Sequence, residues 1–100
     1  SAAHAAKLAS SHDATVIIPV YNNIVDTLLS IVSVLELETR HSFDIIVADD
    51  GSSDATSALI PMIGGIVHHL RQPENLGFLG NCNAAAATAQ GRHIILLNND

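Results

Sequence analysis

The stretch FDIIVADDGSSD, residues 43–54, decides the fold of this chain. Its first six residues, 43–48, form a short apolar run rich in β-branched side chains, which predicts a strand buried on both faces of a parallel sheet. The polar cluster that follows, 49–54, supplies turn and cap residues, so we expect a short helix from there to about Met62. A buried strand that leads through a polar turn into a helix is the repeating unit of α/β proteins.

Strand and helix signals alternate along the rest of the chain. Three further short apolar runs predict strands, at 15–20, 66–70 and 92–97. Apolar residues at helical spacing predict a helix over 24–38, capped by Asn22 or Asn23. The alanine-rich segment 80–90 predicts another helix, with Gly91 as its C-cap. The order β-α-β-α-β-α-β predicts an α/β fold, a Rossmann-like three-layer α/β/α sandwich with a mainly parallel sheet.

Composition limits the number of domains and the kinds of partner. The 100 residues fit one small domain, with 1–13 as a leader that we expect to fray and 14–100 as the folded part. Only four residues are basic and they form no run, which argues against a nucleic-acid partner. No apolar stretch approaches the ~20 residues that a membrane span needs. The single cysteine, Cys82, excludes an intrachain disulfide and fits a reducing compartment.

Polar clusters follow three of the predicted strands, at 21–23, 49–50 and 98–100. In open α/β sheets, ligands bind outside the carboxyl ends of the strands, near the switch in strand order. The clusters are acidic and hold no lysine or arginine, so they would repel a phosphate unless a cation intervenes. A hard divalent ion that bridges a diphosphate would resolve this repulsion. Residues 49–52 equally suit an ordinary turn that caps the next helix.

Other reactive residues favour simpler interpretations. The glycines at 77 and 80 stand where a helix start offers N–H groups to an anion, but they match no dinucleotide-binding or Walker pattern. His68 and His69 are neighbours on a predicted strand, so their side chains should point to opposite faces and not share a metal. Cys82 lacks a histidine partner and reads as a small buried thiol.

Three blocks of the sequence resemble the family 2 glycosyltransferases, which have the GT-A fold. They are VIIPVYNN (16–23), DIIVADDGSSDAT (44–56) and ENLGFLGNCNAAAATAQGRHIILLNND (74–100). The blocks stand in the family's order and cover the chain from about residue 14 to its end. Each block alone is moderately specific, and the three together at these spacings make a strong match.

The resemblance implies that the first two blocks hold the nucleotide of a sugar donor. Pro19, Val20 and Tyr21 are expected to lie against the base and ribose. Asp50 is expected to bond the base, while Asp49 orders the loop.

The resemblance assigns the rest of the donor site to the third block. Asn75, Gly77 and Asn83 are expected to shape the donor pocket. The family's D-x-D motif stands here as residues 98–100. This implies that Asp100 binds a Mg²⁺ or Mn²⁺ ion, and that Asn98 is a weaker contact because asparagine replaces the first aspartate.

The resemblance also implies an activity. The expected enzyme transfers a sugar from a UDP- or dTDP-sugar to a hydroxyl of a saccharide or lipid-linked acceptor, with inversion, in cytoplasmic synthesis of cell-envelope polysaccharide. The catalytic base and the acceptor half are expected beyond Asp100, so this fragment alone should be inactive. A non-catalytic nucleotide-binding module is the alternative. A phosphohydrolase or nucleotidyltransferase is disfavoured, because 21–23 lack the signature expected after the first strand.

Overall fold

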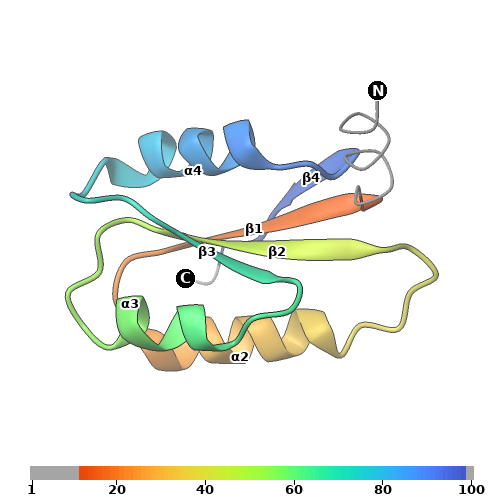
Figure 1. Cartoon of the computed structure of the whole chain (residues 1–100), viewed down its shortest axis with the longest axis horizontal. Helices are drawn as coiled ribbons and strands as arrows, with labels where there is room; N and C mark the ends of the chain where they lie inside the picture. The colour runs from red at the N-terminus through yellow and green to blue at the C-terminus, as the bar shows by residue number, and fades with distance from the viewer. Residues whose placement is uncertain (1–11, 99–100) are drawn as a thin grey trace.

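The computed structural model describes residues 12–98, in which strands and helices alternate as predicted (Figure 1). Their order is β1 (Ala14–Val20), α2 (Ile24–Leu35), β2 (Phe43–Asp49), α3 (Thr56–Leu59), the 3₁₀ turn η1 (Ile60–Met62), β3 (Val67–Arg71), α4 (Gly77–Thr88) and β4 (His93–Leu96). The leader predicted at 1–13 lies outside the described residues except for the last two. No helix within 12–98 is long and apolar enough to cross a membrane.

The four strands form one parallel sheet in the order β3-β2-β1-β4. The chain builds outward from β1 through β2 to β3, and then crosses back so that β4 pairs with the other side of β1. Residues 14–17 of β1 are aligned with 93–96 of β4. The switch in strand order therefore falls between β1 and β4, which is where open α/β sheets bind ligands.

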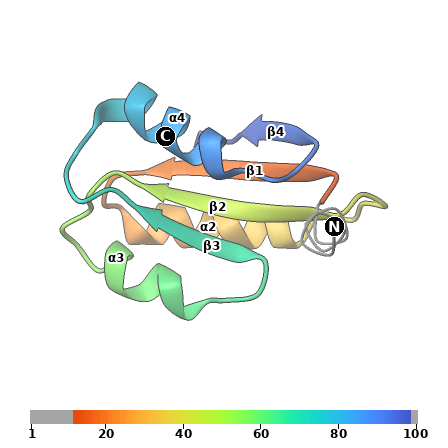
Figure 2. The same ribbon diagram turned by 45° about the horizontal axis from the view of Figure 1, so that its top comes forward.

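Helices cover both faces of the sheet, which confirms the three-layer sandwich (Figures 1 and 2). On one face, α2, α3 and η1 pack against alternate residues of the strands, and the buried members of this cluster are Val16, Ile18, Val20, Ile31, Val34, Ile45, Val47, Ile60 and Val67. On the other face α4 covers a smaller cluster of Ile17, Ile46, Ala48 and Ala85. Burial on both faces explains why β1 and β2 are apolar runs without polar alternation.

Pro19 stands in a central strand, a position that usually needs its backbone N–H. The Leu97 N–H donates to the Ile17 carbonyl at 2.9 Å, so Ile17 turns its backbone groups toward β4. Because backbone groups alternate between the two neighbouring strands, Pro19 also faces the β4 side. The aligned pairs of β1 and β4 end at Ile17 and Leu96, two residues before Pro19. Proline is therefore tolerated because the ladder has already ended on that side.

Two helix boundaries differ from the prediction. Helix α2 ends at Leu35 rather than at residue 38, and exposed residues 36–40 follow it. Asn23 stands at the N-cap position of α2, in a left-handed backbone conformation. Its side chain makes no capping hydrogen bond, so the prediction that Asn22 or Asn23 caps the helix with its side chain is wrong. Helix α4 begins at Gly77 rather than at Gly80, because Asp50 accepts two backbone N–H groups at its start.

Gly91 is not the C-cap of α4. The helix ends at Thr88, and Ala89 takes the cap position in an extended conformation. Gly91 lies instead against the start of β1, where its N–H donates to Thr15 Oγ1 at 3.0 Å. A Cβ at Gly91 would stand 2.4 Å from the Thr15 nitrogen and 2.5 Å from the Ala14 carbonyl carbon. This position needs glycine for close backbone approach, not for a left-handed turn.

We expect Gly91→Ala to lower the free energy of unfolding by about 1–3 kcal/mol, the usual cost of overpacking, because the added methyl group meets rigid backbone of β1. Gly80→Ala is the matched control, since its new Cβ would stand 3.1 Å from Leu76 Cβ, a milder contact than the 2.4 Å approach at Gly91, and alanine favours a helix. Urea unfolding of both variants measures the difference. Equal stability of the two variants would contradict this packing.

Candidate functional site

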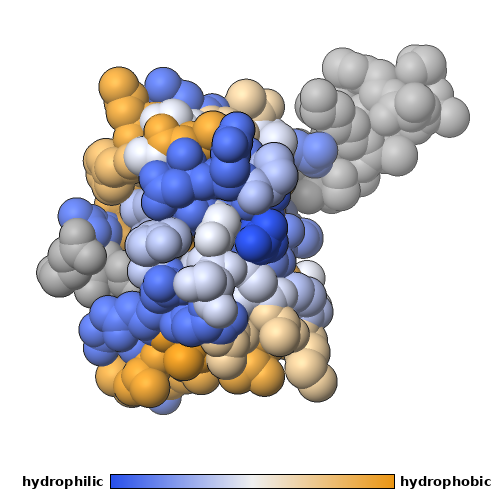
Figure 3. All heavy atoms as spheres, turned by 90° about the vertical axis from the view of Figure 1, so that its left-hand side faces the viewer, coloured by the Kyte–Doolittle hydropathy of each residue, from blue (hydrophilic) through white to orange (hydrophobic). Residues whose placement is uncertain are grey.

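A cavity of about 380 Å³ lies at the carboxyl ends of β1 and β2. It brings together seven residues that the sequence predicted for nucleotide binding, namely Pro19, Val20, Tyr21, Asp50, Asn75, Gly77 and Asn98. Figure 3 views this end of the molecule, where hydrophilic residues spread across the centre and hydrophobic ones lie above and below. None of the residues that line the cavity is a lysine or an arginine.

Two consecutive residues in the loop after β1 have a left-handed backbone conformation. Asn22 and Asn23 have φ angles of 57° and 66°, and asparagine is one of the few side chains that tolerates this region. The Asn22 side chain then accepts N–H bonds from Ser53 at 2.8 Å and Asp54 at 3.1 Å, while its own N–H donates to Ser52 Oγ. The loop after β1 is thereby fastened to the loop after β2.

Asp49 is the buried anchor of the loop after β2. Its Oδ1 accepts the Ser52 N–H at 2.9 Å, and its Oδ2 accepts from Ser57 Oγ at 2.7 Å and lies 2.8 Å from His69 Nε2. Burial alone raises the pKa of Asp49, but the hydrogen bonds from Ser52, Ser57 and His69 outweigh it and leave the pKa lowered. The contacts agree with the expectation that Asp49 orders the loop.

Asp50 points the other way, to the start of α4. Its Oδ1 accepts the Leu76 N–H at 2.7 Å and its Oδ2 accepts the Gly77 N–H at 3.0 Å. A carboxylate at this position satisfies donors that a helix start leaves unpaired and favours the positive end of the helix dipole. Gly51, with φ of 77°, lets the loop pass close to the backbone of Glu74. The turn-and-cap interpretation of 49–52 thus describes the contacts of both carboxylates, although Asp50 also lines the cavity.

The acidic residues do not converge on one point. Asp49 faces α3 and β3, Asp50 faces α4, and Asp54 accepts the Thr56 N–H at the start of α3. Across residues 12–98, no three histidine, cysteine or acidic side chains are arranged to hold a metal ion. Asp100, the predicted metal ligand, lies outside the described residues. The metal expectation therefore rests on Asp100 and on the oxygen-rich, cation-free lining of the cavity.

The contacts of His68, His69 and Cys82 indicate structural rather than catalytic roles. His68 Nε2 lies 3.5 Å from Asp44, whereas His69 pairs with Asp49, so the neighbouring rings have separate partners as predicted. Desolvation and the nearby Asp50 charge raise the pKa of Cys82. A raised pKa disfavours the thiolate, which agrees with the interpretation that Cys82 is not a nucleophile.

Four further residues line the cavity: Asn22 and Asn23, which belong to the polar cluster predicted at 21–23, and Phe78 and Asn81, which were not predicted for the site. Asn81 stands four residues after Gly77, on the same face of α4. The placement of the helix start at Gly80 hid this relation. Asn83, which was predicted, is exposed on α4 and is not among the lining residues, so its role stays a prediction.

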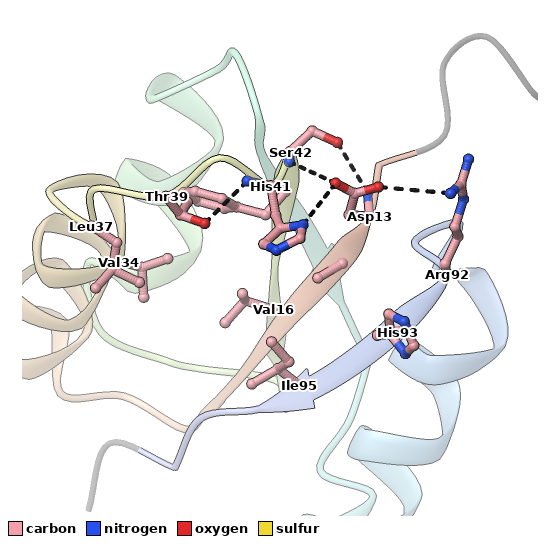
Figure 4. Close-up of a pocket in the computed structure, with 12 residues that line it drawn as sticks. Asp13, Val16, Val34, Leu37, Thr39, His41, Ser42, Arg92, His93 and Ile95 are labelled. Atoms are coloured by element: carbon pink, nitrogen blue, oxygen red, sulfur yellow. Dashed lines mark hydrogen bonds and ion pairs between the residues drawn. The ribbon is translucent and has the colours of Figure 1, made fainter.

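A larger hollow, of about 570 Å³, lies at the opposite end of the sheet (Figure 4). Its walls include Val16, Val34 and Ile95. On its rim the Asp13 carboxylate accepts the Ser42 N–H at 3.2 Å and lies 3.3 Å from His41 Nδ1. It therefore sits at the amino ends of the strands, away from the switch point, with Asp13 already paired. The cavity at the carboxyl ends is the better candidate.

Comparison with known proteins places the chain in a family. The model of glycosyl transferase family 2 matches residues 15–100, and the chain belongs to that family. In fold it is similar to a mannosyltransferase from Pyrobaculum calidifontis, solved in complex with GDP-Man and Mn²⁺, with a TM-score of 0.79 and 21% identity over 90% of this chain. This similarity confirms the predicted GT-A fold. The chain spans 28% of that enzyme's length, and no curated protein matches it significantly.

The lowered pKa of Asp49 predicts an acid-sensitive loop. A carboxyl whose folded pKa is lowered stabilises the fold fully above its unfolded value, here 3.8, and this contribution disappears as pH falls through the lower folded pKa. We expect the free energy of unfolding to fall below about pH 4, and Asp49→Asn to flatten that decline. The variant should keep part of the slope, because the pKa values of Asp13 and Asp54 are lowered too. Parallel curves for wild type and variant in acid would contradict the assignment.

The bonds of Asp50 predict a local effect on α4. Asn has a single acceptor oxygen, so Asp50→Asn removes one of the two acceptors at the helix start. The Gly77 N–H also donates to Asn75 Oδ1 at 3.0 Å, so the Leu76 N–H is the more sensitive readout. We expect a loss of about 1.5–3 kcal/mol in stability, typical of hydrogen bonds to charged groups, and faster amide exchange at Leu76. Asp26→Asn, at an exposed position of α2, is the control. Unchanged exchange at Leu76 would show that the carboxylate does not hold the helix start.

Proposed function

We propose that the cavity at the carboxyl ends of β1 and β2 binds a nucleoside-diphosphate sugar, the donor for glycosyl transfer. One observation carries the proposal: in a chain of glycosyl transferase family 2, the cavity stands beside the switch in strand order and is built from the loops after β1, β2 and β3. That is where an open parallel sheet offers a ligand converging loops and a helix start.

Within this cavity, Pro19, Val20 and Tyr21 form the proposed surface for the base and ribose. Tyr21 is 53% exposed and lines the cavity, so part of its surface is available to a base. Asp50 is proposed to contact the base with the remaining lone pairs of its oxygens, since each already accepts one backbone N–H. Asn75 and Gly77 line the same cavity, and Asn83 belongs to the proposal through the family resemblance alone.

The diphosphate end is proposed to need Mg²⁺ or Mn²⁺, held by Asp100 with Asn98 nearby. The cavity lining has carboxylate and amide oxygens and no basic side chain that would neutralise a diphosphate. Oxygen donors suit both ions. When bound, such an ion would offset the charge that develops on the departing nucleoside diphosphate. The Mn²⁺ and GDP-Man in the similar mannosyltransferase support this part of the proposal.

Transfer is proposed to proceed by direct displacement with inversion, in which a carboxylate base removes the proton of the acceptor hydroxyl. Asp50 is a poor candidate for this base because both its oxygens already serve α4, and it is the only carboxylate among the described residues that line the cavity. We therefore place the base and the acceptor site beyond Asp100, and expect these 100 residues to bind the donor without transferring it. We also propose a cytoplasmic role in cell-envelope polysaccharide synthesis, which the family resemblance alone supports.

The test is calorimetric titration with UDP, dTDP and GDP, each with Mn²⁺ and with excess chelator. UDP and dTDP represent the expected donors, and GDP represents the donor of the similar mannosyltransferase. We expect at least one diphosphate to bind, and chelator or Asp100→Ala to weaken it by about tenfold or more, which corresponds to 1.4 kcal/mol.

Glu38→Ala is the matched control, because it removes one exposed negative charge from the turn after α2, outside the cavity. Binding that survives both chelator and Asp100→Ala unchanged would refute the metal-bridged diphosphate. Sugar transfer by this chain alone would refute the assignment of the base to a missing region. Binding without transfer in a longer chain that continues past residue 100 would favour the non-catalytic module.

A further inference from the structure

Asn81 is a buried amide with one partner missing. It lies on α4 facing the sheet and is only 1% exposed. Its Nδ2 donates to the Ala48 carbonyl at the end of β2, at 2.7 Å. This contact fixes the orientation of the amide, because a flipped group would set two oxygens against each other. Among residues 12–98, its Oδ1 has no hydrogen-bond donor.

An unpaired buried acceptor is costly, by about 1–3 kcal/mol, and native proteins leave few of them. One other side-chain atom in the described part of the chain shares this condition, Thr56 Oγ1 at the start of α3. Thr56 is not among the residues that line the cavity at the carboxyl ends, whereas Asn81 is. The unpaired oxygen of Asn81 therefore belongs to a residue that lines this cavity.

The surroundings of Asn81 limit what that ligand group can be. Asp50 lines the same cavity and carries a negative charge, so an anionic phosphate is disfavoured there. The proposed Mg²⁺ or Mn²⁺ belongs to the diphosphate end of the donor, with Asp100 and Asn98, so it is not the partner that we assign to Asn81. A neutral group with a hydrogen-bond donor remains. Tyr21 and Phe78, both about half exposed, add flat apolar surface to the same lining. A flat ring with N–H groups on its edge meets each condition.

We propose that Asn81 Oδ1 accepts a hydrogen bond from an N–H group on the edge of the nucleobase, and so helps to select the base. This inference rests on the proposed function, in which the cavity holds a nucleotide. The hydrogen bond from Nδ2 to the Ala48 carbonyl fixes the amide, so Oδ1 distinguishes bases by whether they have an N–H donor at that position. A base edge without a donor at that point leaves the oxygen buried and unpaired, and this penalty is a source of specificity.

The test compares each base with an analogue that has lost its ring N–H. The probes are UDP with N3-methyl-UDP and GDP with N1-methyl-GDP, titrated by calorimetry against the wild-type chain and two variants. Asn81→Leu keeps the side-chain volume and removes the acceptor. Gln90→Leu makes the matched change from an amide to leucine at an exposed position just after α4, outside the cavity and outside the proposed donor site.

We expect wild type and Gln90→Leu to prefer the unmodified diphosphate by tenfold or more. Asn81→Leu should weaken that diphosphate about tenfold and leave the methylated one nearly unchanged, so that the preference collapses. If Asn81→Leu weakens both members of a pair by the same factor, Asn81 is only structural and the inference is wrong. Equal affinity of the wild type for both members refutes it without any variant. Failure of the wild type to bind either diphosphate overturns the proposed function itself.

Discussion

The Asp50 carboxylate accepts hydrogen bonds from the backbone N–H groups of Leu76 and Gly77. These two bonds connect the loop after β2 to the start of α4, and both segments line the candidate cavity. They tie the end of a buried central strand to the start of a helix that arrives from the edge of the sheet. Without that carboxylate, the Leu76 N–H would lose its acceptor while the Gly77 N–H would keep Asn75 Oδ1, and the N-terminal end of the helix dipole would face no counter-charge. The cavity exists because that turn is held beside β1 and β2. Asp49, its neighbour in sequence, fixes the opposite side of the same loop through Ser52, Ser57 and His69.

The adjacent carboxylates of Asp49 and Asp50 have different partners for a geometric reason. Consecutive residues at the end of a strand point to opposite faces, so Asp49 enters the layer of α3 and Asp50 enters the layer of α4. The pair therefore does not form a common anion cluster that needs a cation. What the cavity offers a ligand is a set of acceptor oxygens, from Asp50 and from asparagines contributed by several loops, next to exposed aromatic rings. Such a lining complements a ligand rich in N–H and hydroxyl donors. Charge neutralisation for a diphosphate has to come from elsewhere.

Much of the fold follows from local pattern alone. Runs such as 15–20 and 43–48 are too short for helices and too apolar for exposed strands, so a parallel sheet covered on both faces was predictable. The convergence of Tyr21, Asp50 and Asn98 also follows, since parallel strands bring their carboxyl ends to one edge. The start of α4 was not predictable, because it depends on a carboxylate 26 residues earlier in the chain. Gly91 looked like a helix terminator and serves instead to let backbone pass backbone, a tertiary requirement that no local spacing reveals. The unpaired Oδ1 of Asn81 could not be predicted either, because it too depends on tertiary contacts.

The strand order has a consequence for how the chain is made. Of the described strands, β1 is synthesised first and lies between β2 and β4, yet its partner β4 is aligned with it 79 residues later, as in the pair Ala14 and His93. Until β4 has left the ribosome, one whole side of the most apolar strand has no neighbour. β2 and β3 can assemble on the other side in the meantime, so the nascent chain passes through a three-stranded stage with a bare hydrophobic edge. Such edges recruit other strands. The side chains of β4 are about half exposed, so substitutions there would be expected to have small effects. Because β4 covers this edge, such substitutions should nevertheless lower expression yield and increase aggregation and chaperone dependence.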